Sequence, residues 1–210
     1  RGMPPGTSIS FNKVTRAKFA PGSTFKVVTA TAGLLAGYSP MDGAFCDGWY
    51  TPPGIGVRFP CNFKPGHGSQ NLYEALQHSC NVFFYRWAYK VGTERMLDAA
   101  TSFGFGERTD FELVTPHEES PGKVAQIGDK IYRGSVIQMG IGQGALIDVT
   151  PIQMARAYSA LCNGGTLYRP RILKEVRSAE GNRIDQVTEY NGKTIEVGKP
   201  EPQGTLPLSD

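Results

Sequence analysis

The stretch FAPGSTFKVVTATAGLLAG, residues 19–37, places a serine and a lysine three positions apart at the start of a predicted helix. A Pro-Gly pair interrupts the chain just before it, and an apolar stripe with helical spacing follows from Phe25. Residues three apart share one face of a helix, so we expect the side chains of Ser23 and Lys26 to lie together. The sequence predicts a helix over residues 23–36 that is capped by this serine.

The Ser-x-x-Lys pattern is weak by itself, because the chain contains it three times, at Ser10–Lys13, Ser23–Lys26 and Ser120–Lys123. Only the second pair opens a convincing helix, since the first lies in a polar lead-in and the third contains a Pro-Gly pair. A lysine whose pKa is lowered by burial could take the serine proton and make the hydroxyl a nucleophile. The alternative is an ordinary capping serine beside a solvated lysine.

The composition sets broad limits on the class of protein. The 210 residues suffice for one large domain, and we expect residues 1–210 to form a single one. The net charge of +3 comes from scattered basic residues, which gives no support to nucleic-acid binding. No apolar run approaches the roughly 18 residues of a membrane span. GIGQG, residues 140–144, lacks the spacing of a phosphate-binding loop, so no organic cofactor is expected.

Helices are predicted early in the chain and strands late. Apolar periodicity, caps and glycine stops predict further helices over residues 71–79, 81–92, 93–104 and 150–163. The N-caps expected for three of them are Asn71, Thr93 and Thr150. Two strands, over 166–178 and 182–190, are joined by a predicted turn, and this order indicates an α+β fold. Residues 38–70 form a long, irregular, Gly/Pro-rich loop, which must be functional or pinned by another group.

A second element supports the serine–lysine pair. Ser79, Cys80 and Asn81 lie where one predicted helix ends and an aromatic-rich one begins. A Ser-x-Asn turn offers a hydroxyl for proton relay and an amide that can hold a substrate carbonyl. If both of those side chains face one cleft, Cys80 must point away from it, towards the loop over residues 38–70.

Three segments together resemble one protein family. FAPGSTFKVVTA, GHGSQNLYEALQHSCNVFFY and GIGQGALIDVTPIQMARAYSALCNGGTLYRPRIL are similar, in this order and spacing, to the transpeptidase domain of penicillin-binding proteins. The resemblance runs from about residue 10 to about residue 175 and is strongest to the class B, elongation-type group known as penicillin-binding protein 2. It implies a β-lactamase/transpeptidase-like fold, with a helical subdomain and part of a central antiparallel sheet.

The resemblance also implies the chemistry of a serine D,D-transpeptidase. Ser23 would be the acylated nucleophile, Lys26 its general base, and Ser79 with Asn81 the second motif. The substrates would be the D-Ala-D-Ala ends of peptidoglycan stem peptides, and β-lactams would acylate the same serine. The family further implies the periplasmic face of the inner membrane as the location, and cell-wall elongation proteins as partners of the full-length protein.

One motif of the family, Lys-(Ser/Thr)-Gly, is missing. Lys193-Thr194-Ile195 has isoleucine in place of the glycine that lets substrate lie against an edge strand. We therefore expect an incomplete catalytic domain, truncated at both ends and impaired by itself. Two other functions stay open: a D,D-carboxypeptidase or β-lactamase with water as acceptor, and a non-catalytic penicillin-recognising scaffold. Glu118 and Glu119, which could suggest the deacylating glutamate of class A β-lactamases, are expected in a solvated loop.

Four potential metal ligands lie in and beside the Gly/Pro-rich loop. Cys46, Cys61, His67 and Cys80 follow the pattern Cys-x14-Cys-x5-His-x12-Cys. Three thiolates and an imidazole form a common structural zinc set, and the long loop needs a pin. Some elongation-type members of the family carry zinc at positions that match these four, so a structural Zn2+ is predicted. A disulfide between Cys46 and Cys61, with Cys80 as a small buried residue, is the alternative.

Overall fold

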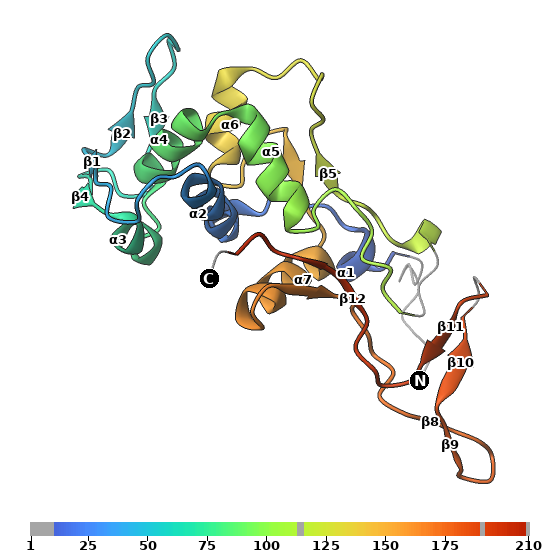
Figure 1. Cartoon of the computed structure of the whole chain (residues 1–210). Helices are drawn as coiled ribbons and strands as arrows, with labels where there is room; N and C mark the ends of the chain where they lie inside the picture. Colours follow the sequence, from blue (N-terminus) through green and yellow to red (C-terminus); the bar gives the residue numbers. More distant parts are fainter. Residues whose placement is uncertain (1–10, 113–115, 190–191, 209–210) are drawn as a thin grey trace, which may run out of the picture. The chain divides into compact units, whose positions relative to one another are not determined.

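The computed structural model describes residues 11–112, 116–189 and 192–208. They group into two compact units (Figure 1). The helical unit comprises Phe19–Gly106 and Lys123–Val149, and the hairpin unit comprises Arg1–Lys18, Glu107–Gly122 and Thr150–Asp210. Every predicted site residue belongs to the helical unit. Among the described helices, none is long and apolar enough to cross a membrane.

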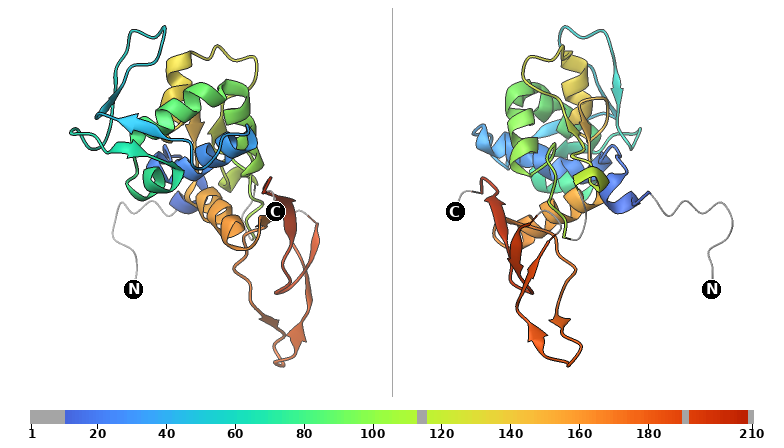
Figure 2. Two further views of the ribbon diagram at one scale, coloured as in Figure 1. Left: turned by 60° about the vertical axis from the view of Figure 1, so that its left-hand side comes forward. Right: turned by 90° about the vertical axis from the view of Figure 1, so that its right-hand side faces the viewer.

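The helical unit is organised around one central helix (Figures 1 and 2). Its helical elements are the 3-10 turn η1 (Gly22–Phe25), α2 (Lys26–Leu35), α3 (Leu72–Gln77), α4 (Asn81–Val91), α5 (Thr93–Ser102) and α6 (Arg133–Met139). Helix α4 contacts α2, α3, α5 and α6. Most of its aromatic run is buried, so these residues form core rather than an exposed face.

The contact between α2 and α4 depends on a small residue. The rings of Phe83 and Trp87 on α4 lie 5.0 Å apart between centroids, and both side chains are buried. A Cβ atom at Gly33 on α2 would lie 2.1 Å from the indole carbon Cε3 of Trp87. Only glycine therefore allows the two helices to approach this closely, and their packing sets the position of the start of α2 relative to the start of α4.

The strands of the helical unit are short and pair two by two. Antiparallel pairs form between β1 (Ala44–Cys46) and β4 (Gly68–Gln70), between β2 (Trp49–Tyr50) and β3 (Phe59–Pro60), and between β5 (Lys123–Val124) and β6 (Ile147–Asp148). The first two pairs lie within residues 38–70, so the expectation of a loop without secondary structure is wrong there. Strands of two or three residues are too short to produce a period of two in the sequence.

The hairpin unit combines one long helix with antiparallel strand pairs. Its elements are α1 (Lys13–Arg16), η2 (Pro116–Glu118), α7 (Pro151–Cys162), β7 (Thr166–Tyr168), β8 (Val176–Arg177), β9 (Arg183–Ile184), β10 (Gln186–Thr188), β11 (Thr194–Glu196) and β12 (Pro202–Thr205). β7 pairs with β12, β8 with β9, and β10 with β11. The predicted turn is present between β8 and β9, but the predicted strand over 166–178 is broken. Pro170 interrupts it, because proline has no N–H to continue the ladder.

The helix caps follow the sequence predictions in two of four cases, and the predicted cap at Ser23 is taken up with the site below. Asn71 and Thr150 each form a capping box with the residue three positions on, Glu74 and Gln153. Thr93 is not a cap, because it is already the first residue of α5 and the preceding Gly92 turns the chain with a φ of 84°. Local capping patterns thus predicted where α3 and α7 begin.

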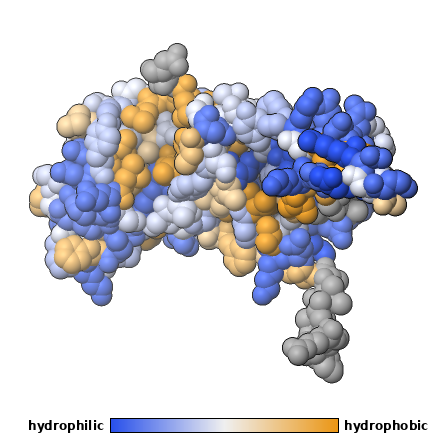
Figure 3. Space-filling model, turned by 90° about the horizontal axis from the view of Figure 1, so that it is seen from below, coloured by the Kyte–Doolittle hydropathy of each residue, from blue (hydrophilic) through white to orange (hydrophobic). Residues whose placement is uncertain are grey.

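Hydrophobic side chains are not confined to the interior. Figure 3 shows hydrophobic and hydrophilic residues side by side on one face of the molecule. In the helical unit, Leu34 and Leu35 at the end of α2 and Tyr73 on α3 are 43%, 54% and 63% exposed. The two helices contact each other, and both carry exposed apolar side chains.

Candidate active site

Ser23 and Lys26 lie on one side of the turn that opens α2. Ser23 is in the 3-10 helix η1, and Lys26 is the first residue of α2. In a 3-10 helix the side chains at positions i and i+3 eclipse each other, which brings the hydroxyl and the amine together. Ser23 is exposed, whereas Lys26 is only 2% exposed. The prediction that Ser23 caps the helix is wrong: Pro21 holds that place, and the serine hydroxyl contacts Ser79.

The amine of Lys26 is surrounded by acceptors from the second motif. Its Nζ donates to the backbone oxygen of Ser79 at 2.6 Å, to the Ser79 Oγ at 2.9 Å and to the Asn81 Oδ1 at 2.7 Å. An ammonium group has three donors and no acceptor, so these contacts use all of them. The oxygen of the Asn81 amide must face the lysine, which leaves the Nδ2 donors directed elsewhere.

A chain of close contacts joins the exposed serine to the buried lysine. The Ser79 Oγ lies 3.0 Å from the Ser23 Oγ and 2.9 Å from the Lys26 Nζ. Burial lowers the pKa of Lys26 to about 8, although the negative charge of Cys80 and Cys61 acts in the opposite direction. A neutral amine is therefore accessible near neutral pH, and the Ser79 hydroxyl is placed to pass a proton from Ser23 to Lys26.

Ser79 has an unusual backbone conformation. Its φ is 52°, in the left-handed region that a non-glycine residue seldom adopts. Helix α3 ends here in a Schellman motif, with the Cys80 N–H donating to the Ala75 oxygen at 2.9 Å and the Ser79 N–H donating to the Leu76 oxygen at 3.1 Å. Glycine normally takes this position. Serine at this place indicates that the hydroxyl is kept at a conformational cost of about 1 kcal/mol.

The GIGQG segment holds the turn that carries Ser23. The Gly22 N–H donates to the Gly142 oxygen at 2.8 Å, and Gly142 has a φ of 68°. A Cβ atom at Gly142 would lie 2.2 Å from the Gly22 oxygen. Thr29, which is fully buried, donates from its Oγ1 to the Gly140 oxygen at 2.9 Å. The segment, which lacks the spacing of a phosphate loop and forms part of the family resemblance, is thus a brace for the turn that carries Ser23.

The three cysteines and the histidine of the Gly/Pro-rich loop meet at one point. The His67 Nδ1 lies 3.6 Å from the sulfur atoms of Cys46 and Cys61, and the Cys61 and Cys80 sulfurs are 4.0 Å apart. All four ligand atoms lie within 4.8 Å of one another. A tetrahedral zinc ion holds its sulfur ligands about 3.8 Å apart and sulfur and nitrogen about 3.5 Å apart. The cluster therefore fits such an ion. No disulfide joins Cys46 to Cys61.

The surroundings of the cluster favour an ionised Cys61 and an ordered imidazole. A hydrogen bond with Cys80 lowers the pKa of Cys61 to about 4, with help from backbone amides, whereas the same contact and burial raise the pKa of Cys80. His78 stacks on the His67 ring, with 5.7 Å between centroids, and its Nδ1 lies 2.7 Å from the Gln70 Oε1. His78 thus supports the His67 ring.

Cys80 links the cluster to the cleft. Ser79 and Asn81 both contact the Lys26 amine, and the residue between them is fully buried against Cys61. Successive side chains here point in opposite directions. Cys80 therefore connects the loop over residues 38–70 to Ser79 and Asn81.

In the hairpin unit, the Lys193-Thr194-Ile195 triplet and Glu119 both take part in structural contacts. Ile195 of the Lys-Thr-Ile triplet is buried in the hairpin of β10 and β11, and Lys193 forms an ion pair with Glu201. The expectation that Glu119 lies in a solvated loop is wrong, because it is 4% exposed. Its carboxylate accepts hydrogen bonds from the Thr109 N–H and Oγ1, both at 2.6 Å, and from the Phe111 N–H.

Comparisons with known proteins agree on one family. A family model described as "Penicillin binding protein transpeptidase domain" matches residues 7–201. Peptidoglycan D,D-transpeptidase MrdA of Escherichia coli K12 is 34% identical over 184 residues, which are 84% of this chain and 28% of that protein.

Solved structures of two penicillin-binding proteins are also similar to this chain. Pseudomonas aeruginosa PBP2, in complex with WCK 5153, matches with a TM-score of 0.72 and 28% identity over 94% of this chain and 43% of that one. Helicobacter pylori PBP2, in complex with MreC, matches with a TM-score of 0.69 and 24% identity over 77% and 31%. The chain thus spans less than half the length of each of these relatives.

Proposed function

The chain belongs to the penicillin-binding protein transpeptidase family and has its β-lactamase/transpeptidase fold, and from this premise we propose that it carries the acyl-transfer site of a peptidoglycan D,D-transpeptidase. The observation that supports this most directly is the line of atoms from the exposed Ser23 hydroxyl through Ser79 to the buried Lys26 amine. Such a line joins a nucleophile to a base, which is the requirement of acyl transfer through serine.

The reaction begins with attack on the penultimate D-Ala carbonyl of a stem peptide. The Ser23 Oγ forms a bond to the carbonyl carbon, and its proton passes through the Ser79 hydroxyl to the Lys26 Nζ. When the tetrahedral intermediate collapses, the peptide C–N bond breaks and the same proton returns to the leaving D-Ala nitrogen. An amine of a neighbouring stem then attacks the ester on Ser23, loses its proton along the same path, and restores the serine hydroxyl.

Asn81 positions the substrate in this scheme. Its Oδ1 accepts from Lys26, so the Nδ2 donors are available for a backbone carbonyl of the stem peptide. A β-lactam presents the same kind of acyl group, and Ser23 would attack its ring carbonyl and stay acylated. The four side chains of the site therefore divide into a nucleophile, Ser23, a two-part base, Ser79 with Lys26, and a substrate-holding amide, Asn81.

The experiment is acylation by a fluorescent penicillin followed by product analysis in the full-length protein. Labelling at Ser23 that disappears in Ser23→Ala, together with cross-linked products from stem peptides, is the expected result. Fast hydrolysis of the acyl-enzyme would instead favour a D,D-carboxypeptidase or β-lactamase. Unchanged growth of cells that carry only Ser23→Ala would favour a non-catalytic scaffold.

For the Cys46, Cys61, His67 and Cys80 cluster we propose a structural Zn2+. The support is the tetrahedral spacing of the four atoms and the acidity of the Cys61 thiol. A bound zinc ion would neutralise the thiolates and cross-link β1, the segment between β3 and β4 and the segment between α3 and α4, with no open position for catalysis. Elemental analysis of protein purified without added zinc tests this: a mass lower by two hydrogens and no metal would indicate the disulfide instead.

Location and partners follow from the same proposal. An enzyme that cross-links peptidoglycan acts outside the cytoplasmic membrane, so we place the site at the periplasmic face of the inner membrane. The H. pylori relative was solved with MreC, and a cell-wall elongation protein of that kind is the partner proposed for the full-length protein. Co-purification with and without cross-linking in cells would test the partner.

A further inference from the structure

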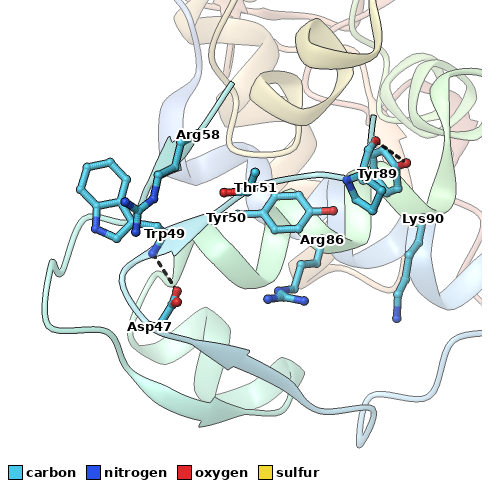
Figure 4. A pocket seen from close by; sticks show the side chains of 9 residues that line it. Asp47, Trp49, Tyr50, Thr51, Arg58, Arg86, Tyr89 and Lys90 are labelled. Carbon is cyan, nitrogen blue, oxygen red and sulfur yellow. Dashed lines mark hydrogen bonds between the residues drawn. The ribbon is translucent and has the colours of Figure 1, made fainter. Parts of the chain in front are cut away.

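A hollow of about 640 Å3 lies in the helical unit between the β2–β3 hairpin and α4 (Figure 4). We call it the Arg86 pocket, and its aromatic and cationic lining residues are Trp49, Tyr50, Tyr89, Arg58, Arg86 and Lys90. One carboxylate, that of Asp47, also lines it and accepts a hydrogen bond from the Trp49 backbone N–H, which leaves the cations in excess. It does not contain Ser23 or Lys26. Helix α4 rises about 1.5 Å and turns about 100° per residue, so Lys90 lies about 14 Å along the helix from Asn81 and on its opposite face. The pocket is therefore separate from the acylation site.

The cations of this pocket are held by aromatic rings rather than by acids. The Arg58 guanidinium lies 4.4 Å from the centroid of the Trp49 ring, and that of Arg86 lies 5.1 Å from the Tyr50 ring. Lys90 follows Arg86 by one helical turn. Within the described part of the chain, none of the three cations forms an ion pair. A guanidinium that stacks by its face keeps its N–H edges for an anion.

Arg86 also has an unmet hydrogen-bonding requirement. Its Nε is buried and has no hydrogen-bond partner among the described residues. A buried donor without a partner is destabilising, and a ligand oxygen would remove that penalty. Figure 4 shows the Arg86 guanidinium passing the Tyr50 ring, on the same side of the pocket as the Lys90 ammonium. Two cations from successive turns thus approach one region, where a carboxylate could bind both.

We propose that the Arg86 pocket is a second binding site for peptidoglycan, and that it holds a carboxylate of a stem peptide on a glycan strand. This inference rests on the proposed function, because that function brings such peptides to the protein. Arg86 and Lys90 bind the carboxylate, and Arg58 adds its charge. A strand bound here stays attached to the enzyme while the Ser23 cleft receives a different stem.

The size of the hollow favours a compact ligand over an acidic segment of a partner protein. Its volume lies in the range of about 300–1,000 Å3 that is typical of small-ligand sites. A stable protein–protein interface needs about 800 Å2 on each partner and tends to exclude charged groups from its centre. Here three cations line a concave site. A disaccharide-peptide with its free carboxylates matches that combination of shape and charge.

The test uses full-length protein acylated with penicillin, so that the Ser23 cleft is filled, and calorimetric titration with a soluble disaccharide-tetrapeptide. We expect saturable binding that Arg58→Gln and Lys90→Gln together weaken by about tenfold or more. Both residues are exposed, so their replacement leaves the core intact. The matched control is Arg95→Gln on α5, which removes an exposed charge from the same unit outside the pocket and should leave the Kd unchanged.

Each outcome of the titration decides the question. No binding by acylated protein, or equal Kd values for the double variant and the control, overturns the proposal. Binding of an uncharged N-acetylglucosamine tetramer with the same Kd would also overturn it. Binding of a glutamate-rich peptide but not of the disaccharide-tetrapeptide would assign the pocket to a protein partner. Failure of penicillin to acylate Ser23 refutes the proposed function instead, and the double variant still decides the pocket.

Discussion

The left-handed backbone of Ser79 gives the sharpest test of the site. We compare Ser79→Gly with Ser79→Ala, because both remove the hydroxyl and differ only in the freedom of the backbone. A φ of 52° costs a residue with a Cβ atom about 1 kcal/mol more than glycine. The two Schellman hydrogen bonds, at 2.9 and 3.1 Å, keep the backbone there in both variants. Ser79→Gly should therefore be more stable than Ser79→Ala by about 1 kcal/mol.

Thermal unfolding measures this difference. For a chain of this size, 1 kcal/mol corresponds to a difference of roughly 2–4 °C in Tm. The matched control is the preceding residue, His78, whose φ of −85° is right-handed. Glycine should be worse than alanine there, by about 0.5–1 kcal/mol. The sign of the glycine effect thus reverses between two adjacent residues.

The same variants test the proton path. Without the Ser79 hydroxyl, the path from the Ser23 Oγ through the Ser79 Oγ to the Lys26 Nζ is interrupted. Acylation by fluorescent penicillin should therefore slow by about 10²–10⁴-fold in both variants. Equal Tm values for the glycine and alanine variants would refute the strained backbone. An acylation rate equal to that of the unaltered protein would refute the relay, even if the stability order were as expected.

Three further outcomes are expected. Only neutral Lys26 accepts a proton, and its pKa is about 8. The acylation rate should therefore rise about tenfold per pH unit below pH 8 and become constant above pH 8. An acylation rate that does not change with pH would exclude Lys26 as the base. Gly142→Ala should lower the free energy of unfolding, measured by chemical denaturation, by about 2–3 kcal/mol. The control is Gly54→Ala, with an expected loss of about 1 kcal/mol, because Gly54 has a φ of 70° but open space around it. Equal losses in the two variants would contradict the bracing role of Gly142. Removing metal with a chelator should lower the Tm and slow acylation. In the Cys61→Ser variant the chelator should change neither the Tm nor the acylation rate. If the chelator also leaves both unchanged in the unaltered protein, the metal proposal is contradicted.

The features that local sequence determines were predictable. Capping boxes at Asn71 and Thr150 and the apolar stripe after Phe25 placed three helices, because each depends on residues within one or two turns. The pairing of Ser23 with Lys26 is also local, since it needs only a spacing of three. The Cys and His ligands could be identified by type alone, although their loop is irregular.

What the sequence did not indicate depends on contacts between distant residues. Nothing about Ser79 itself predicts a left-handed φ, which arises from the end of α3 and from the contacts with Lys26. Glu119 was expected in solvent because its neighbours are polar, yet its three hydrogen-bond donors come from Thr109 and Phe111 on another segment. The role of Gly142 is visible only when Gly22 is beside it.

The brace formed by GIGQG bears on the order of folding. Hydrogen bonds join Gly22 to Gly142 and Phe19 to Val149, and Thr29 bonds to Gly140 across a separation of 111 residues. Contacts of such long range require a large loop closure and form late compared with local helices. On a ribosome, α2 can become helical as soon as it emerges, but the turn that holds Ser23 has no brace until the chain has been made through Val149. Reactivity towards penicillin should therefore appear abruptly during synthesis, after most of the helical unit already exists.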